Sequence, residues 1–242
     1  MILQDNNFDW VFWSRTMLFV AFIIILLAGS LFIITKASKV EMQTTRRILQ
    51  GYALFGICFA LTRVFFLLST FELRRVAPIE DTFLNNIWIV NAYTVTMASI
   101  IFVFRVVEHY ILTQKPVFTM FAVASFSVDV LALILTILQI NIGTLPPKDL
   151  ALWIQTIVGP VLGIAICVLY IRVIKNSTGH IKSQAIKTLI GIILILGGIL
   201  LDTSLITFPE AIAWIRSLVT PIIFIIGVLL VFNALIENIK ES

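Results

Sequence analysis

Seven long apolar stretches dominate this sequence and constrain its fold more than any other feature. A helix that crosses the hydrocarbon core of a bilayer needs about 20 predominantly apolar residues. Of the 242 residues, 60% are hydrophobic and 12% are charged, which is more apolar surface than a soluble domain of this size can bury. The stretches span residues 12–34, 48–71, 83–104, 117–140, 150–171, 186–208 and 212–232. They predict a single all-α domain over residues 1–242, a seven-transmembrane-helix bundle that is a multi-pass protein of the cell membrane.

The loops between these stretches alternate in charge. The first, third and fifth loops or their flanks carry Lys36, Lys39, Arg46, Arg47, Arg105, Lys115, Arg172, Lys175, Lys182 and Lys187. The other loops mix Arg74, Arg75, Lys148 and Arg216 with Glu72, Glu80, Asp81, Asp149 and Glu210. Because cytoplasmic loops carry an excess of Lys and Arg, we predict an outside N-terminus and a cytoplasmic C-terminus.

Aromatic residues agree with this orientation. The tryptophans Trp10, Trp13, Trp88, Trp153 and Trp214 all fall at or near predicted outer ends of spans. The tyrosines Tyr52, Tyr110 and Tyr170 fall at predicted cytoplasmic ends. Because Trp and Tyr concentrate at membrane–water interfaces, we expect these side chains to mark the two boundaries of the bilayer.

Missing residue types exclude several function classes. Microbial rhodopsins, which this chain resembles in plan but not in motif, hold retinal on a lysine of the last helix. No lysine lies between Lys187 and Lys240, so a retinal Schiff base is excluded. The two histidines, His109 and His180, both lie at the predicted cytoplasmic side, which argues against haem ligands or a metal site within the membrane.

The absence of known catalytic and cofactor-binding motifs also bears on function. The sequence has no Gly-rich phosphate loop, Cys-x-x-Cys pair or nucleophile elbow, so we predict neither an enzyme nor a bound cofactor. The net charge is +4, but most basic residues lie in short loops beside apolar segments, and the absence of a basic surface argues against nucleic acid as a partner.

Polar residues within the spans are the candidate functional residues, because they are costly at membrane depth. Arg63 lies nine residues before Glu72, so roughly 13 Å below the outer boundary at 1.5 Å per residue. Asp202 lies at a similar depth in the sixth span, and Asp129 lies near the middle of the fourth. The third span adds Asn91, Tyr93, Thr94 and Thr96.

Pairing would explain the depth of Arg63. A lone charge there costs about 2.5–3.5 kcal/mol on insertion scales, and an Arg63–Asp202 ion pair would offset much of that cost. In the alternative, Arg63 extends outward to the headgroups and Asp202 is protonated or hydrated. The inward arrangement predicts a ligand-binding set of Arg63, Asn91, Tyr93, Asp129 and Asp202.

Two further groups concern partners. Glu108 and His109 lie three and four residues after Arg105, so the three share a helix face and are candidates for coupling to a cytoplasmic partner. Gly159 and Gly163 flank Pro160 at a spacing that permits close helix contact, either within the bundle or in a homo-oligomer.

Three functions fit these features. The first is a membrane sensor or receptor that binds a small ligand or lipid in the outer half and signals through a cytoplasmic partner, or as part of a longer protein. The second is a small-solute transporter with an intramembrane carboxylate. The third is a membrane subunit of a larger complex.

Overall fold

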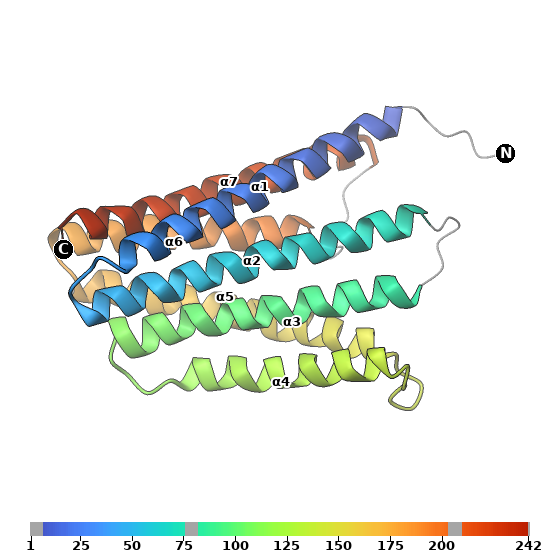
Figure 1. Cartoon of the computed structure of the whole chain (residues 1–242), viewed down its shortest axis with the longest axis horizontal. Helices are drawn as coiled ribbons and strands as arrows, with labels where there is room; N and C mark the ends of the chain where they lie inside the picture. The colour runs from blue at the N-terminus through green and yellow to red at the C-terminus, as the bar shows by residue number, and fades with distance from the viewer. Residues whose placement is uncertain (1–6, 76–81, 203–209, 242) are drawn as a thin grey trace.

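The computed structural model of the chain describes residues 7–75, 82–202 and 210–241, and these residues form a helical bundle (Figure 1). Seven of the described helices are long and apolar enough to cross a membrane, which confirms the predicted seven spans. The helices are α1 (Asn7–Ala37), α2 (Gln43–Arg75), α3 (Phe83–Arg105), α4 (Val117–Ile137), α5 (Pro147–Asn176), α6 (Gly179–Asp202) and α7 (Glu210–Glu241). The last part of the predicted sixth span, residues 203–208, lies outside the described residues.

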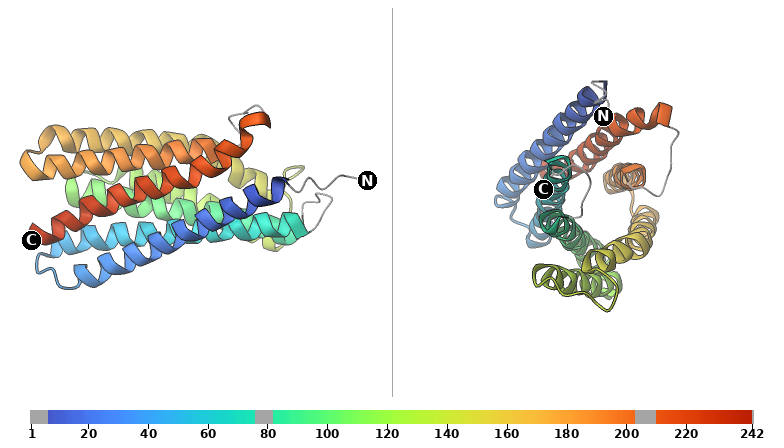
Figure 2. Two further views of the ribbon diagram at one scale, coloured as in Figure 1. Left: turned by 90° about the horizontal axis from the view of Figure 1, so that it is seen from above. Right: turned by 90° about the vertical axis from the view of Figure 1, so that its right-hand side faces the viewer.

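The helices run alternately up and down, so each one packs against its neighbour in sequence (Figures 1 and 2). α1 also packs on α7, and this contact closes the bundle. α3 also packs against α5, so these two helices contact more than their neighbours in sequence. We call the end where α1 begins the N-terminal face and the end where α7 finishes the C-terminal face.

An aromatic core fills the space between α1, α2 and α7. The rings of Phe22 and Phe224 stack with centroids 5.5 Å apart. Phe59 lies edge-on to both rings, at 5.9 Å from each. Such offset and edge-to-face pairs are the favoured arrangements of aromatic rings, and they fix the rotation of these three helices about their axes.

Glycines set the distance between α6 and α7. A Cβ atom added to Gly191 would lie 2.6 Å from the carbonyl oxygen of Gly227 and 2.7 Å from Cγ2 of Val231. The two helices therefore touch backbone to backbone, which only a residue without a side chain permits.

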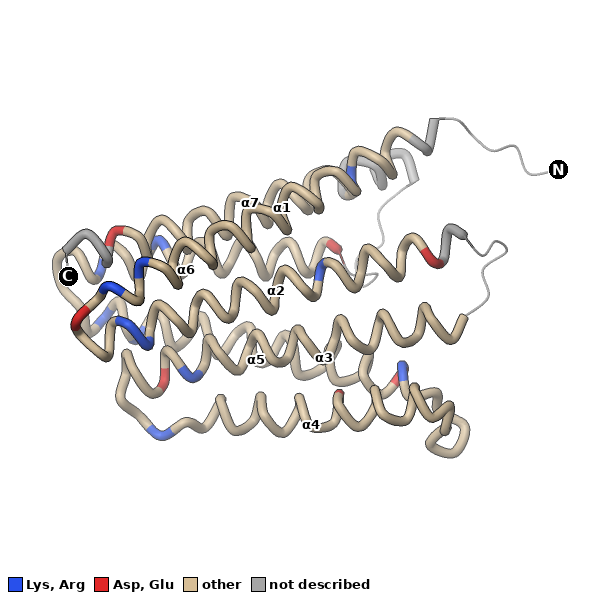
Figure 3. The backbone as a smooth tube through the Cα atoms, viewed as in Figure 1, with Lys and Arg blue, Asp and Glu red and all other residues tan. Residues whose placement is uncertain are grey.

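The C-terminal face carries most of the Lys and Arg residues that the structure describes (Figure 3). Trp10, Trp13 and Trp153 are exposed, as expected of an aromatic belt. The orientation relative to the membrane stays a prediction. The side chains of Arg74, Arg75, Glu80, Asp81, Glu210, Trp214 and Arg216, on which part of it depends, lie outside the described residues.

Two of the three tyrosines expected at the bilayer boundary are instead inside the bundle. Tyr52 of α2 and Tyr170 of α5 are both buried, and their hydroxyl groups hydrogen-bond to each other. Their side chains therefore face the interior of the bundle, and their level relative to the bilayer boundary stays a prediction. A buried hydroxyl needs a partner, and here each supplies the other's.

Candidate functional site

Arg63 and Asp202 meet across the bundle near the N-terminal face. Nη1 of Arg63, on α2, donates to Oδ2 of Asp202, on α6, over 2.8 Å. The side chain of Arg63 is 5% exposed and that of Asp202 is 22% exposed. The inward pairing predicted from depth is confirmed, and Arg63 does not extend to the headgroups.

A second arginine, which sequence reasoning missed, completes this group. Nη2 of Arg15, on α1, donates to the other oxygen of Asp202, Oδ1, over 2.8 Å. Its side chain is 39% exposed. The available signal was its position three residues inside the predicted first span, where a charge also needs a partner. Three helices, α1, α2 and α6, are thus joined through one carboxylate.

Phenylalanine rings surround the Arg63 guanidinium. Its Cζ lies 4.2 Å from the ring centroid of Phe224, 5.3 Å from Phe59, 5.5 Å from Phe19 and 5.8 Å from Phe66. A guanidinium over an aromatic face is attracted by the ring quadrupole, by up to about 2 kcal/mol where water is excluded. Nε of Arg63 is buried without a hydrogen-bond partner among the described atoms, so the rings replace part of its polar environment.

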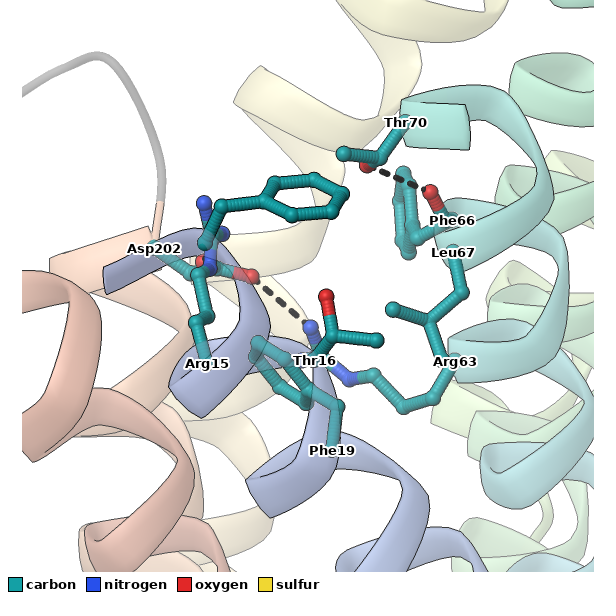
Figure 4. Close-up of a pocket in the computed structure, with 9 residues that line it drawn as sticks. Arg15, Thr16, Phe19, Arg63, Phe66, Leu67, Thr70 and Asp202 are labelled. Atoms are coloured by element: carbon teal, nitrogen blue, oxygen red, sulfur yellow. Dashed lines mark hydrogen bonds and ion pairs between the residues drawn. The ribbon is translucent and has the colours of Figure 1, made fainter. Parts of the chain in front are cut away.

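A small cavity of about 50 Å³ opens beside these charges (Figure 4). Its lining comes from α1 (Phe12, Arg15, Thr16, Phe19), α2 (Arg63, Phe66, Leu67, Thr70) and α6 (Asp202). In Figure 4 the charged groups of Arg63 and Asp202 meet on one side of the cavity, with Phe66, Leu67 and Thr70 on the other. The cavity therefore has two cations and one anion on an otherwise largely apolar wall.

Asp129 belongs to a different cluster. It is fully buried on α4, and its Oδ2 accepts a hydrogen bond from Nε2 of Gln155, on α5, over 3.3 Å. The same Nε2 donates to the backbone oxygen of Tyr93, on α3, over 3.0 Å. Thr94 approaches the backbone oxygen of Asp129 at 3.4 Å. Asp129 thus lies between α3, α4 and α5, whereas the arginines connect α1, α2 and α6.

The remaining members of the predicted set do not contact Arg63. The Asn91 amide donates to the carbonyl of Ile87 in its own helix, over 3.0 Å. The Tyr93 ring packs edge-on against Phe66, with centroids 5.7 Å apart, and so lies next to the ring that lines the cavity. The predicted set is therefore divided into the Arg63–Asp202 pair, the Asp129–Tyr93 cluster and Asn91, and the contact between Tyr93 and Phe66 connects the first two.

The coupling group predicted at the other end is also divided. After α3 the chain forms a π-helical segment, η1 (Val106–Ile111), which departs from the regular spacing assumed for the shared face. Arg105 and His109 are exposed, but Glu108 is fully buried. The expectation that all three share a face was wrong.

Glu108 instead caps α4. Its carboxylate accepts hydrogen bonds from the backbone N–H of Phe118 at 3.0 Å and from the N–H and hydroxyl of Thr119 at 2.8 and 2.7 Å. A helix N-terminus carries free N–H groups and a partial positive charge, so a carboxylate is stabilised there. This position gives Glu108 a structural role at the start of α4.

Another polar contact joins α6 to α7 near the C-terminal face. Nζ of Lys187 donates to both carboxylate oxygens of Glu237, over 2.6 and 2.8 Å. His180 lies 3.9 Å from the same carboxylate, and Asn233 donates to it over 3.3 Å. Sequence reasoning treated Lys187 only as a marker of orientation, because nothing local relates it to a residue fifty positions later.

The two glycines of α5 differ in their surroundings. A Cβ atom on Gly163 would lie 2.9 Å from Leu196 of α6, so Gly163 packs within the bundle. A Cβ atom on Gly159 would meet no described atom within 4 Å. A homo-oligomer through this pair of glycines stays a prediction.

No family model, curated protein or solved structure matches this chain. Function is therefore inferred from the geometry of these clusters.

Proposed function

We propose that this protein is a receptor-like membrane sensor that binds the anionic group of a small ligand or lipid at the Arg15–Asp202–Arg63 cluster and signals through a cytoplasmic partner. One observation carries the proposal: a single carboxylate is shared by two guanidinium groups from two other helices. The two guanidinium groups and one carboxylate have a formal charge of +1, so the cluster would attract a second anion. Guanidinium groups are the usual protein partners of carboxylates and phosphates because they offer several N–H donors in one plane.

The size of the cavity restricts the ligand. Pockets for whole drug-sized molecules measure about 300–1,000 Å³, whereas this one measures about 50 Å³. It fits a charged group of a few atoms, with the rest of the ligand outside. The apolar lining residues Phe12, Phe66 and Leu67 favour an anionic amphiphile, whose chain would continue along the surface of α1 and α2.

A ligand anion would compete with Asp202 for the arginines. Asp202 is the last described residue of α6, and Phe224, which packs against Arg63, belongs to α7. These two helices are in backbone contact at Gly191 and Gly227, and Lys187 and Glu237 join them near the C-terminal face. Release of Asp202 would therefore move α6 and α7 as a unit, which is a change that a cytoplasmic partner could detect.

The test measures this movement directly. Cys58 and Cys167 are replaced by Ala, and single cysteines for spin labels replace Ser38, just after α1, and Ser183, on α6. The labelled protein is placed in nanodiscs of zwitterionic lipid. Distances between the two spin labels are measured by pulsed double electron–electron resonance. They are compared before and after adding phosphatidic acid to the bilayer, or inorganic phosphate to the solution. We expect the lipid to change the distance distribution; an effect of free phosphate alone would identify a soluble ligand instead.

Two variants locate the effect. Arg15→Gln removes one charge-assisted donor, worth about 1.5–3 kcal/mol, so we expect the lipid response to need roughly tenfold or more lipid. Arg172→Gln, which removes an exposed arginine from the end of α5, is the matched control and should respond as the parent does. An equal response of Arg15→Gln and the parent would exclude the cluster as the binding site.

A small-solute transporter is the second candidate, and a separate observation favours it. Asp129 is a fully buried carboxyl group with one oxygen that has no described partner, the kind of group that proton-coupled transporters use. Uptake of a broad panel of labelled solutes into proteoliposomes, driven by a proton gradient, tests this function. Flux lost in Asp129→Asn would favour transport over sensing.

A further inference from the structure

Asp129 is a buried acid that the arginine cluster does not use. It has no exposed surface, and its Oδ2 receives a single long hydrogen bond from Gln155. Its Oδ1 is buried with no hydrogen-bond partner in the part of the chain that the structure describes. An unsatisfied carboxylate oxygen in such a place calls for a physical explanation.

The groups that face Asp129 carry no positive charge. α3 contributes Tyr93 and Thr94, and α5 contributes Gln155; of these only Tyr93 is titratable. Tyr93 itself packs against a small apolar cluster of Val90, Ala132 and Ala151. Within residues 7–75, 82–202 and 210–241, no Lys, Arg or His forms an ion pair with Asp129.

An ionised carboxylate here would therefore be a buried charge without a counter-ion. Its desolvation costs several kcal/mol, with no Coulombic attraction to offset it. A carboxylic acid carries no net charge, so burying it costs far less. The surroundings of Asp129 thus favour a bound cation, and a proton is the smallest one.

The orientation of Gln155 distinguishes a proton from a metal ion. Its Nε2 donates to two acceptors, the backbone oxygen of Tyr93 at 3.0 Å and Oδ2 of Asp129 at 3.3 Å. The Tyr93 carbonyl can only accept, so this contact requires the NH₂ group rather than the amide oxygen at that position, and the same group faces Asp129. Hard cations need several oxygen ligands, and this amide presents a donor in place of one.

We propose that Asp129 is a proton-binding site within the membrane domain, with the proton on Oδ1 and with Gln155 donating to Oδ2. The proposal does not depend on the ligand of the arginine cluster. The acid keeps α3, α4 and α5 in their present packing, because loss of the proton would leave a charge that has to reach water or a counter-ion. The Tyr93–Phe66 contact places this junction next to the cavity lining.

Infrared spectroscopy of the protein in nanodiscs tests the proposal near neutral pH. A protonated carboxylic acid has a carbonyl stretch distinct from that of a carboxylate, and the band shifts on exchange into D₂O. We expect this band in the parent protein and in the control Asp149→Asn, which alters a carboxyl group in the first turn of α5. We expect Asp129→Asn to lack it, and Gln155→Leu to shift it because one hydrogen bond to the carbonyl oxygen is lost.

Several outcomes would contradict a protonated Asp129. The absence of the band from the parent, or its persistence unchanged in both Asp129→Asn and Gln155→Leu, would overturn the proposal. Thermal stability in NaCl and in choline chloride is the second measurement. A Na⁺-specific stabilisation of the parent that Asp129→Asn loses would assign the site to sodium instead. Should Asp129→Asn not fold, the band shift in Gln155→Leu still decides the matter.

Discussion

Replacing Asp202 by Ala should destabilise the protein far more than replacing either exposed partner of an ordinary surface ion pair. The change leaves two guanidinium groups without their shared carboxylate. Arg15 is 39% exposed and can turn to water or lipid headgroups. Arg63 is 5% exposed, is enclosed by phenylalanine rings, and already has one unpartnered nitrogen, so it has no such exit.

The loss of stability therefore differs between the two arginines when the ion pair of each is broken. Breaking a buried pair from one side costs about 3–5 kcal/mol, because the remaining charge stays desolvated. An ion pair of the exposed kind contributes about 0–1 kcal/mol. We expect Asp202→Ala to lower the free energy of unfolding by about 3–5 kcal/mol and Arg15→Ala to lower it by about 1 kcal/mol or less.

A double variant provides the sharper test. Arg63→Leu combined with Asp202→Ala removes the buried charge together with its partner, and apolar replacement of both members of a buried pair is often neutral. The double variant should therefore be more stable than Asp202→Ala alone. The measurement is unfolding in mixed detergent micelles under identical conditions, for the parent, both single variants and the double variant.

Two outcomes would show that Arg63 is not held as a buried charge by Asp202. Equal losses for Asp202→Ala and Arg15→Ala would mean that Arg63 reaches water through the cavity. Additive losses in the double variant would mean that Arg63 and Asp202 contribute independently, as residues without a shared partner do.

Three further predictions use the same unfolding assay. Gly191→Ala should lower the free energy of unfolding by about 1–3 kcal/mol through overpacking, because the new Cβ would meet a backbone oxygen of α7 at 2.6 Å. The control Gly197→Ala, with nothing described within 4 Å, should be neutral or stabilising. Equal losses in the two variants would contradict this explanation. Glu108→Ala should cost about 1–3 kcal/mol and speed amide hydrogen exchange in the first turn of α4, and unchanged exchange would rule out the cap. Tyr170→Phe should cost about 1–3 kcal/mol, since the buried hydroxyl of Tyr52 loses its partner, and adding Tyr52→Phe should cost little more.

The seven spans and the Arg63–Asp202 pair were predictable from sequence for the same reason. A helix that crosses hydrocarbon must be long and apolar, so the positions of the spans follow from the apolar runs in the sequence. A charge inside such a helix is rare and costly, so its partner is sought among the few opposite charges at the same depth. Arg63 and Asp202 met that condition, whereas Arg15 lies only three residues inside the predicted first span and was not considered as a second partner of Asp202.

The grouping of Asp129 with Arg63 could not be decided in this way. Residue counting gives the depth of a side chain but not the direction in which it points around its helix. In soluble proteins an apolar stripe supplies that direction. Here nearly every face of α4 is apolar, so the contacts with Tyr93 and Gln155 that orient Asp129 become visible only in the folded bundle.

Glu108 was misplaced for a backbone reason. A spacing of three or four residues defines a face only in a regular α-helix. The π-helical turn from Val106 to Ile111 shifts that register, so Glu108 faces the start of α4 while Arg105 and His109 face outward. No residue in this segment is a Pro or Gly that would have indicated the departure.

The helices are joined by two kinds of contact, ion pairs and close backbone packing, and these differ in how readily they can change. Near the N-terminal face, two arginine side chains reach one carboxylate from two directions, and a rotamer change can transfer the more exposed of them, Arg15, to another anion. Between α6 and α7, backbone contact at Gly191 and Gly227 allows no comparable exchange, because any displacement opens a gap between rigid helices. A conformational change in this protein should therefore begin at the ion pairs of Asp202 and leave α6 and α7 packed together. The movement should open α6 away from α2, where the side chains of Arg63 and Asp202 rather than backbone contacts bridge the bundle.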